Sequence, residues 1–327
     1  MVGIAHTPVM LDEILSFLVP QSDHALMLDC TLGEGGHAEA FLARYPGISC
    51  LGIDADPDIQ ARARERLSPY AGRVMYRQGY FDDILESWDG RSPDIVLFDL
   101  GISMFHFAES GRGFGHGKDE KLDMRLSPEA PRSAARLLAE EPEEEIARII
   151  YVYGEERMSR RIAKAIVQER RKGGIETTRE LAELVWNAVP QAYRHGRLHP
   201  ATRTFQALRI AVNDELGRAE RGIRRAVALL ASGGLIAVLS FHSLEDRVAK
   251  NVLREFAGHR SANDGFPGSA NPPIPLNERV GGLPALELVT KKPLAPTPGE
   301  IARNPASRSA KLRVARKMGG GTGRTAA

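Results

Sequence analysis

Four short apolar runs, each separated from the next by a helical pattern, constrain the fold of the first hundred residues more than any other feature. They cover residues 25–32, 48–54, 73–79 and 94–100, and the last reads DIVLFDL. An apolar run of this kind is typical of a strand that is buried on both faces in a sheet covered by helices. The alternation therefore predicts βαβ units, a parallel sheet and an α/β fold.

The alternation stops in the middle of the chain. Residues 109–204 contain no convincing strand, but they hold an acidic helical stretch at 140–150, a basic one at 155–172 and another at 177–189. We interpret this region as a helical domain inserted into an α/β domain, which is formed by residues 1–108 and 205–318.

The α/β pattern then resumes with a predicted helix at 205–230 and a strand at 234–241. Residues 258–284 indicate a loop, and 319–327 a disordered tail. Two further strands are predicted at 285–290 and 310–315. Only a proline-rich segment joins them, which favours an antiparallel pair over another βαβ unit and argues against a dinucleotide-binding sheet.

Several local features of the sequence lead us to expect a cytoplasmic protein without membrane association. Cys30 and Cys50 lie in apolar runs and are interpreted as buried thiols in a reducing compartment. The N-terminus lacks the pattern of a signal peptide, and the most apolar stretch, 227–241, is interrupted by Ser232, Gly233 and Gly234. The net charge of +2 does not by itself indicate a nucleic-acid partner.

A glycine-rich loop after the first strand is a candidate ligand site. Its sequence, GEGGH at 33–37, departs from the dinucleotide fingerprint and suits a methyltransferase loop better. Asp54, with Asp56 as its competitor, ends the second strand and could accept hydrogen bonds from ribose hydroxyls. A tight turn followed by a helix cap explains the same residues equally well.

Two further residues strengthen the ligand site, because the carboxyl ends of parallel strands share one edge of a sheet. Phe81 follows the third strand, and Asp99 ends the fourth. We therefore expect the glycine loop, Asp54, Phe81 and Asp99 to meet at that edge.

The chain as a whole resembles the bacterial ribosomal RNA small subunit methyltransferase H family. The segments that carry the resemblance run in order over nearly the whole chain: HTPV, DCTLGEGGH, IDADPD, FDLGIS, KLDMRL, YGEERMSRRIAKAIV, HPATRTFQALRIAVNDEL, SFHSLEDR and NPASRSAKLRVARK. The resemblance implies a Rossmann-like class I methyltransferase sheet with an inserted all-helical domain.

The resemblance also implies the reaction and its cofactor. The family uses S-adenosylmethionine to methylate N4 of a cytidine in the decoding region of small-subunit ribosomal RNA. Its cofactor contacts carry over onto the following residues: Gly35, Gly36, His37, Asp54, Phe81, Asp99 and His106. The last position is a departure, because Met104-Phe105-His106 stands where the family usually has Ser-Pro-Gln. An imidazole can still donate or accept one hydrogen bond there.

The chemistry needs an acceptor for the N–H of a poorly nucleophilic amine. Asp99 and Ser103 are the candidate catalytic residues, although Ser103 reads equally well as a helix cap. Phe105, Phe107 and Phe114 could stack on a splayed-out base or could belong to a core. We predict no catalytic metal, because Ser243 and Asp246 in SFHSLEDR favour a capping arrangement over a site built on His242.

Two basic segments indicate the RNA-binding surface. At 100° per residue, Arg157, Arg160, Arg161 and Lys164 share one side of a helix, opposite Ile162 and Ile166. Residues 291–327 hold nine basic residues and one acid, Glu300, and they supply the remaining candidates: Arg308, Lys311 and Arg313. A solvated helix face is the alternative for the first segment.

We therefore expect a ribosomal RNA cytidine N4-methyltransferase that acts on the assembled small subunit. Two alternatives stay open: a methyltransferase for another nucleic acid, and a ribosome-assembly protein that binds RNA without turnover. The sequence does not decide between a monomer and a homodimer.

Overall fold

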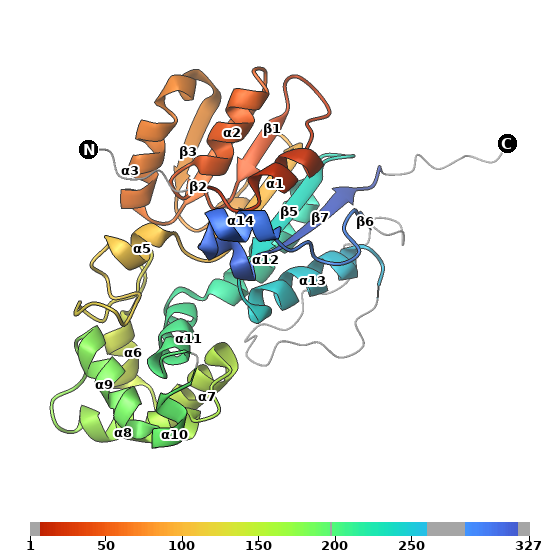
Figure 1. Ribbon diagram of the computed structural model, residues 1–327. Helices are drawn as coiled ribbons and strands as arrows, with labels where there is room; N and C mark the ends of the chain where they lie inside the picture. The colour runs from red at the N-terminus through yellow and green to blue at the C-terminus, as the bar shows by residue number, and fades with distance from the viewer. Residues whose placement is uncertain (1–6, 197, 260–284, 320–327) are drawn as a thin grey trace. The chain divides into compact units, whose positions relative to one another are not determined.

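The computed structural model describes residues 7–196, 198–259 and 285–319 (Figure 1). The chain divides into two compact units, which we call unit 1 (Met1–Gly101 with Leu216–Ala327) and unit 2 (Ile102–Glu215). Most of the predicted loop at 258–284 and all but the first residue of the predicted tail at 319–327 lie outside the described residues.

Unit 1 is built on one seven-stranded sheet with the order β3-β2-β1-β4-β5-β7-β6 (Figure 1). Strands β1 to β5 run parallel to one another, and β7 runs antiparallel to both β5 and β6. The strands span Leu26–Asp29 (β1), Ser49–Asp54 (β2), Val74–Gln78 (β3), Ile95–Asp99 (β4), Leu235–Ser240 (β5), Leu286–Leu288 (β6) and Lys311–Lys317 (β7). The predicted antiparallel pair at the end of the chain is confirmed.

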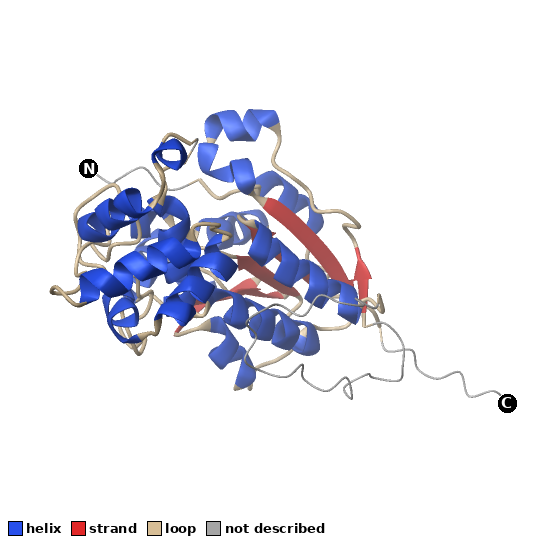
Figure 2. Ribbon diagram, turned by 90° about the horizontal axis from the view of Figure 1, so that it is seen from below, coloured by secondary structure: helices blue, strands red, loops and turns tan. Residues whose placement is uncertain are grey.

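Helices complete unit 1, and Figure 2 shows them on both sides of the strands. They span Leu11–Phe17 (α1), Gly36–Arg44 (α2), Pro57–Arg66 (α3), Phe81–Glu86 (α4), Glu215–Leu229 (α12), Ser243–Phe256 (α13) and Pro298–Arg303 (α14), with short 3-10 helices at Ser68–Arg73 (η1) and Pro305–Ser309 (η3). The expected α/β class is therefore confirmed.

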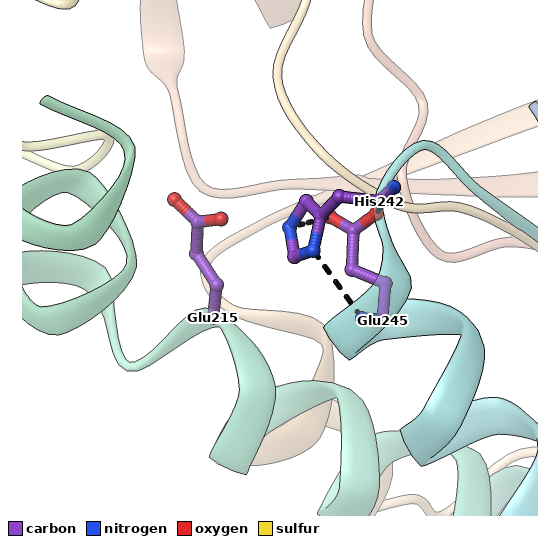
Figure 3. A group of neighbouring side chains, drawn as sticks. All are labelled: Glu215, His242 and Glu245. Atoms are coloured by element: carbon purple, nitrogen blue, oxygen red, sulfur yellow. Dashed lines mark hydrogen bonds and ion pairs between the residues drawn. The ribbon is translucent and has the colours of Figure 1, made fainter. Parts of the chain in front are cut away.

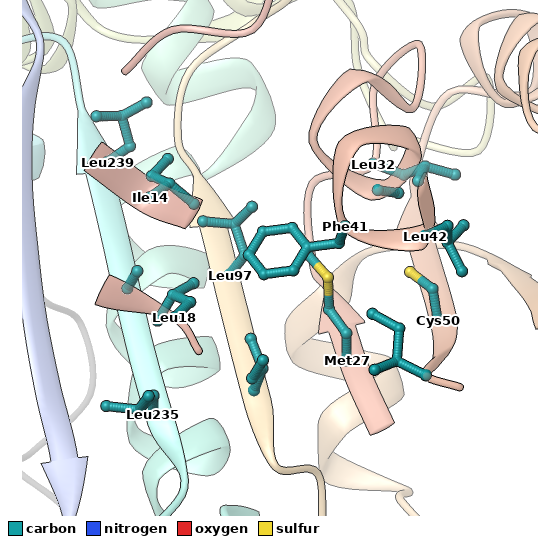
Figure 4. Close-up of a cluster of buried hydrophobic side chains, with 14 of the residues drawn as sticks. Ile14, Leu18, Met27, Leu32, Phe41, Leu42, Cys50, Leu97, Leu235 and Leu239 are labelled. Atoms are coloured by element: carbon teal, nitrogen blue, oxygen red, sulfur yellow. The ribbon is translucent and has the colours of Figure 1, made fainter. Parts of the chain in front are cut away.

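The core of unit 1 explains why the sheet forms. Every residue of β1 and β5 is buried, as is every residue of β4 except Asp99. Ile14 of α1 and Phe41 of α2 pack with Met27 and Leu97 of the sheet in one apolar cluster (Figure 4). Cys50 belongs to the same cluster, and both cysteines are buried free thiols, as predicted.

Unit 2 contains helices and its own apolar core. Its helices span Met104–Ala108 (α5), Ala134–Glu140 (α6), Glu143–Gly154 (α7), Ser159–Arg170 (α8), Thr178–Ala188 (α9), Gln191–Arg194 (α10) and Ala201–Asn213 (α11). Side chains from α6, α7, α8, α9 and α11 make up that core, including Leu137, Ile150, Ile166, Leu181 and Leu208. The three helical stretches expected at 140–150, 155–172 and 177–189 correspond to α7, α8 and α9.

The single helix predicted at 205–230 is wrong. The chain forms α11 and α12 instead, and Asp214 separates them with left-handed backbone angles of φ 49° and ψ 39°. Phe205 and Leu208 of α11 pack in the core of unit 2, whereas α12 packs in unit 1. Unit 2 consequently begins earlier and ends later than 109–204, because α5 and α11 both belong to it.

Helix α12 approaches the sheet closely at one glycine. An ideal Cβ on Gly222 would lie 2.5 Å from two ring carbons of Phe81 and 3.5 Å from the ring of Phe98. Phe81 and Phe98 meet edge to face with their ring centroids 5.3 Å apart. The small residue therefore makes room for the Phe81 ring.

We predict that Gly222→Ala destabilises unit 1, because the added methyl group overlaps the Phe81 ring. The overlap should cost about 1–3 kcal/mol, from which the better helix propensity of alanine recovers at most about 1 kcal/mol. The free energy of unfolding in urea measures the balance. Gly72→Ala is the matched control, since its Cβ would meet nothing within 4 Å. Equal stabilities for the two variants would contradict the prediction.

Candidate functional site

The glycine loop lies at the carboxyl edge of the sheet in unit 1, between β1 and α2. Gly35 is the N-cap residue of α2 and has φ 80°, a left-handed conformation that favours glycine. Gly33 has φ 53°, and its N–H donates a 2.9 Å hydrogen bond to Asp54 Oδ2. The loop after β1 is thus tied to the end of β2.

Asp54 and Asp56, which the sequence leaves as competitors, have different surroundings. Asp54 is partly exposed and accepts hydrogen bonds from Gly33 N–H and Asp56 N–H. Asp56 is fully buried and caps α3 by accepting from Asp58 N–H at 3.0 Å. Of the two carboxylates, Asp54 is therefore the one that a ligand at this edge can reach.

His37 and Asp99 face each other at the same edge. His37 Nε2 lies 3.4 Å from Asp99 Oδ2, and the two side chains are 6% and 26% exposed. The backbone N–H of Asp99 donates to Thr31 Oγ1 at 2.6 Å, which fixes the end of β4 against the glycine loop. Both ring nitrogens of His37 and the Oδ1 atom of Asp99 are buried without a hydrogen-bond partner among the described residues.

Unpartnered buried polar atoms are costly, so their presence here points to a polar ligand. They lie beside a loop with two glycines in left-handed conformations and beside the reachable carboxylate of Asp54. These features fit a nucleoside-containing cofactor that carries charged and hydroxyl groups.

Asp29 is a residue of this site that the sequence interpretation missed. It ends β1, is 1% exposed and accepts a hydrogen bond from Thr31 N–H. Burial raises the pKa of the Asp29 carboxyl to about 7; nearby Asp99 and Asp54 raise it further, whereas His37 and the Thr31 N–H oppose the shift. The signal was present, since Asp29 is the first polar residue after the apolar residues ALML and opens the segment DCTLGEGGH.

Phe81 lies at the predicted place in the fold, and its ring packs within unit 1. It starts α4 directly beyond β3, as predicted, but its ring packs against Phe98 and fills the space beside Gly222. The ring therefore supports the sheet from its α12 face.

Comparison with known proteins now identifies the family. A profile of the MraW methylase family matches residues 3–318. The chain is 46% identical over 315 residues to a ribosomal RNA small subunit methyltransferase H of Treponema denticola, with 96% of this chain and 97% of that protein covered. It is 45% identical to the protein of that name from Thermobifida fusca (96% and 93% covered) and 42% identical to the one from Persephonella marina (96% and 100% covered).

The chain belongs to the MraW methylase family. This membership confirms the resemblance drawn from the sequence motifs, and it makes the protein a methyltransferase.

Two of the predicted site residues of this methylase, Ser103 and His106, belong to unit 2. Ser103 is the N-cap of α5, where its Oγ accepts from Phe105 N–H at 3.2 Å, so the capping interpretation is confirmed. His106 is 4% exposed, and its ring meets the edges of the Phe105 and Phe114 rings.

The three aromatic candidates for base stacking differ in exposure. Phe105 and Phe114 are 8% and 2% exposed, whereas Phe107 is 39% exposed. Phe107 is therefore the one ring of the three that has a face available in unit 2 of the methylase.

The SFHSLEDR segment of the methylase forms a helix cap, although with different residues from those predicted. His242, not Ser243, is the N-cap of α13, and Glu245, not Asp246, completes the capping box (Figure 3). His242 Nδ1 accepts from Glu245 N–H, and His242 Nε2 lies 3.1 Å from Glu245 Oε1. The ring is therefore hydrogen-bonded to the Glu245 N–H through Nδ1, while Nε2 faces the Glu245 carboxylate without a hydrogen bond.

The predicted basic stripe of the methylase is exposed in unit 2. Arg160, Arg161 and Lys164 of α8 and the preceding Arg157 are all exposed, and none forms an ion pair with another described residue. Ile162 and Ile166, on the opposite side of α8, are fully buried. The amphipathic pattern read from the sequence is confirmed.

The C-terminal basic candidates of the methylase divide into two groups. Arg308 is exposed. Lys311 and Arg313, in contrast, both bind the carboxylate of Asp246, at 3.1 Å and 2.7 Å, and Arg313 is 9% exposed. This geometry gives Arg313 a structural role between β7 and α13, and it does not support a phosphate contact.

Among residues 7–196, 198–259 and 285–319 of the methylase, no helix combines the length and the apolar character that a membrane span requires.

We predict that Asp29 makes the methylase less stable as the pH rises. Because the folded-state pKa of about 7 exceeds the ordinary value of 3.8, the folded state holds more protons between these values, and stability falls from about pH 4 to about pH 7. The loss is on the order of 2–4 kcal/mol at 1.36 kcal/mol per pKa unit. Asp29→Asn should flatten this dependence in urea unfolding at pH 5 and pH 8.

Asp23→Asn is the control for that comparison, because Asp23 is an exposed carboxylate of the same unit. The same change in unfolding free energy between pH 5 and pH 8 for wild type and Asp29→Asn would contradict the prediction.

Proposed function

We propose that this methylase transfers a methyl group from S-adenosylmethionine to N4 of a cytidine in small-subunit ribosomal RNA. The observation that carries the proposal is the pair of His37 and Asp99, whose buried, unpartnered polar atoms lie beside the glycine loop. The names of the relatives support the choice of a ribosomal RNA substrate.

The residues at the sheet edge fit the cofactor. Gly35, Gly36 and His37 would hold its methionine portion, because the loop brings backbone close and His37 Nδ1 has no hydrogen-bond partner among the described residues. Asp54 would accept hydrogen bonds from the ribose hydroxyls through the remaining lone pairs of its carboxylate. When bound, S-adenosylmethionine supplies an electrophilic methyl group on its sulfonium.

Asp99 would activate the acceptor amine. The lone pair of the cytosine N4 amine is delocalised into the ring, so the amine is a weak nucleophile. A carboxylate that accepts a hydrogen bond from its N–H builds negative charge on the nitrogen, and it can hold the proton that the amine loses after attack. Asp99 Oδ1 is available for this bond, while Oδ2 faces His37.

The protein's second contribution would be orientation. The Thr31 hydroxyl fixes the backbone of Asp99, and the Gly33 N–H fixes Asp54. Donor and acceptor sites would thereby be held at the ends of β2 and β4, the two strands that flank β1. Holding two reactants in a near-attack geometry lowers the barrier substantially. We assign Ser103 to its capping role in α5.

Unit 2 would bind the RNA backbone. Arg157, Arg160, Arg161 and Lys164 form a stripe of one charge sign with no ion-pair partner among the described residues. Like charges on one helix face repel one another, so such a stripe is best explained by a polyanionic partner. Exposed Phe107 would stack on a base, and Arg308 of unit 1 would add a further phosphate contact.

The substrate would be the assembled small subunit in the cytoplasm. A basic stripe recognises phosphates and not sequence, so selection of a single cytidine requires the shape of folded RNA. Protein-free RNA should consequently be a poorer substrate than the particle.

We predict that wild-type enzyme methylates small subunits from cells that lack it, producing N4-methylcytidine. Asp99→Ala should lower the rate by about 100-fold or more, because the amine loses its hydrogen-bond acceptor. Labelled S-adenosylmethionine and nucleoside mass analysis measure the product. Asp58→Ala is the control, because Asp58 is an exposed acid of α3 in the same unit. Asp94 would not serve, because its carboxylate accepts a hydrogen bond from Leu26 N–H. Unchanged transfer by Asp99→Ala would exclude the proposed role.

We predict that replacing Arg160, Arg161 and Lys164 together by alanine weakens binding to small subunits and makes it less sensitive to salt. The slope of log affinity against log salt concentration should fall in magnitude by about 2–3, close to one per lost phosphate contact. Filter binding over a salt series measures this slope. Arg136→Ala is the control, since Arg136 is also exposed in unit 2 but is paired with Glu140. An unchanged slope would argue against the stripe as the RNA-binding surface.

A further inference from the structure

Residues 7–10, which we call the strap, lie against the start of helix α2 in unit 1. An ideal Cβ on Gly36 would lie 2.6 Å from Pro8 Cγ and 3.3 Å from Pro8 Cδ. Pro8 thus contacts backbone at the residue that separates Gly35 from His37. The strap therefore packs directly against the glycine loop at Gly36.

The strap is anchored on one side by burial. Val9 is 2% exposed and Met10 is fully buried, and both belong to the apolar cluster that contains Ala38 and Phe41 of α2. Met10 also has left-handed backbone angles of φ 52° and ψ 37°, which a residue with a side chain rarely adopts. A strained conformation of this kind persists only when the surrounding structure fixes it.

Two side chains from the far end of the sequence hold the strap at its ends. Met10 N–H donates a 2.6 Å hydrogen bond to Glu300 Oε1, and Asn304 Nδ2 donates a 3.1 Å bond to the Thr7 carbonyl. Glu300 belongs to α14, and Asn304 is its C-cap residue. We call these two residues the clasp.

The clasp is itself fixed by local hydrogen bonds. Glu300 N–H donates to Thr297 Oγ1, the N-cap of α14, at 3.2 Å. The Asn304 carbonyl accepts from both Ser307 N–H (3.0 Å) and Ser307 Oγ (2.7 Å), and Ser307 is fully buried. These contacts hold α14 and the following turn in a defined conformation, so the two clasp side chains present fixed hydrogen-bonding groups to the strap.

We propose that Glu300 and Asn304 are positioning residues for the methyl donor, acting through the strap and Pro8 on the start of α2. The inference rests on the proposed cofactor site at Gly35, Gly36 and His37. Without the clasp, the strained backbone at Met10 relaxes and Pro8 withdraws from Gly36. A smaller fraction of the molecules then has the glycine loop in its binding-competent conformation, so the apparent Kd for the donor rises in inverse proportion to that fraction. The chemical step of the bound complex stays unchanged.

The test measures donor binding and turnover in full-length Glu300→Ala and Asn304→Ala. We expect calorimetry to show the Kd for S-adenosylmethionine raised about 5- to 20-fold, in proportion to the lost competent fraction. KM for the donor should rise to a similar extent, with kcat within about twofold of wild type and the melting temperature nearly unchanged. Glu300→Gln keeps an acceptor oxygen for Met10 N–H and should restore tight binding.

Arg303→Ala is the matched control, because Arg303 is an exposed residue of the same helix and forms no hydrogen bond or ion pair with the strap among the described residues. A variant at the other end of the chain of contacts, Pro8→Ala, provides independent evidence. It should raise Kd to a similar extent, and the double variant Pro8→Ala with Asn304→Ala should bind no more weakly than either single variant.

The outcomes separate this inference from the proposed function. Tight binding by wild type with unchanged Kd in Glu300→Ala and Asn304→Ala would overturn the clasp and leave the methyltransferase assignment in place. Additive effects of Pro8→Ala and Asn304→Ala would also overturn it, because the two residues would then act separately. Absence of donor binding by wild type would overturn the cofactor site and the clasp together.

Discussion

Burial of the parallel strands β1, β4 and β5 on both faces is the constraint on which the rest of unit 1 depends. Residues that alternate toward opposite faces of these strands are almost all apolar, so helices must cover both sides of the sheet. Parallel strands covered in this way place their carboxyl ends at one edge. Asp29, Asp54 and Asp99 are the last residues of their strands and therefore meet there.

The concentration of carboxylates at that edge carries an energetic cost. Asp29 is buried close to two other acids, and its carboxyl group is harder to ionise than an exposed one. His37 and Asp99 also hold polar atoms that no described residue satisfies. A fold selected for stability alone would fill these positions with apolar side chains. These polar atoms destabilise the fold, but they are the atoms that form its candidate site.

The two units present side chains of different chemistry. Unit 1 presents carboxylates, an imidazole and glycine backbone, which suit a small polar cofactor. Unit 2 builds a separate apolar core from helices and presents arginine and lysine side chains on α8, which suit a polyanion. Each candidate binding surface is thus supported by a core of its own.

The sequence by itself determined the α/β class, the antiparallel final strands, the helical insertion, the family and the amphipathic stripe of α8, because apolar periodicity and motif order are local properties of the chain. Only the tertiary structure showed that Asp54, and not Asp56, is the carboxylate that a ligand can reach, and that Arg313 is buried against Asp246. It also showed that His242 caps α13 and that the helical stretch at 205–230 is interrupted at Asp214. It further revealed that Asp29 is a buried acid and that Glu300 and Asn304 form hydrogen bonds with the strap. These outcomes depend on contacts between segments far apart in the sequence or on a local competition for backbone hydrogen bonds, and neither is encoded in residue spacing.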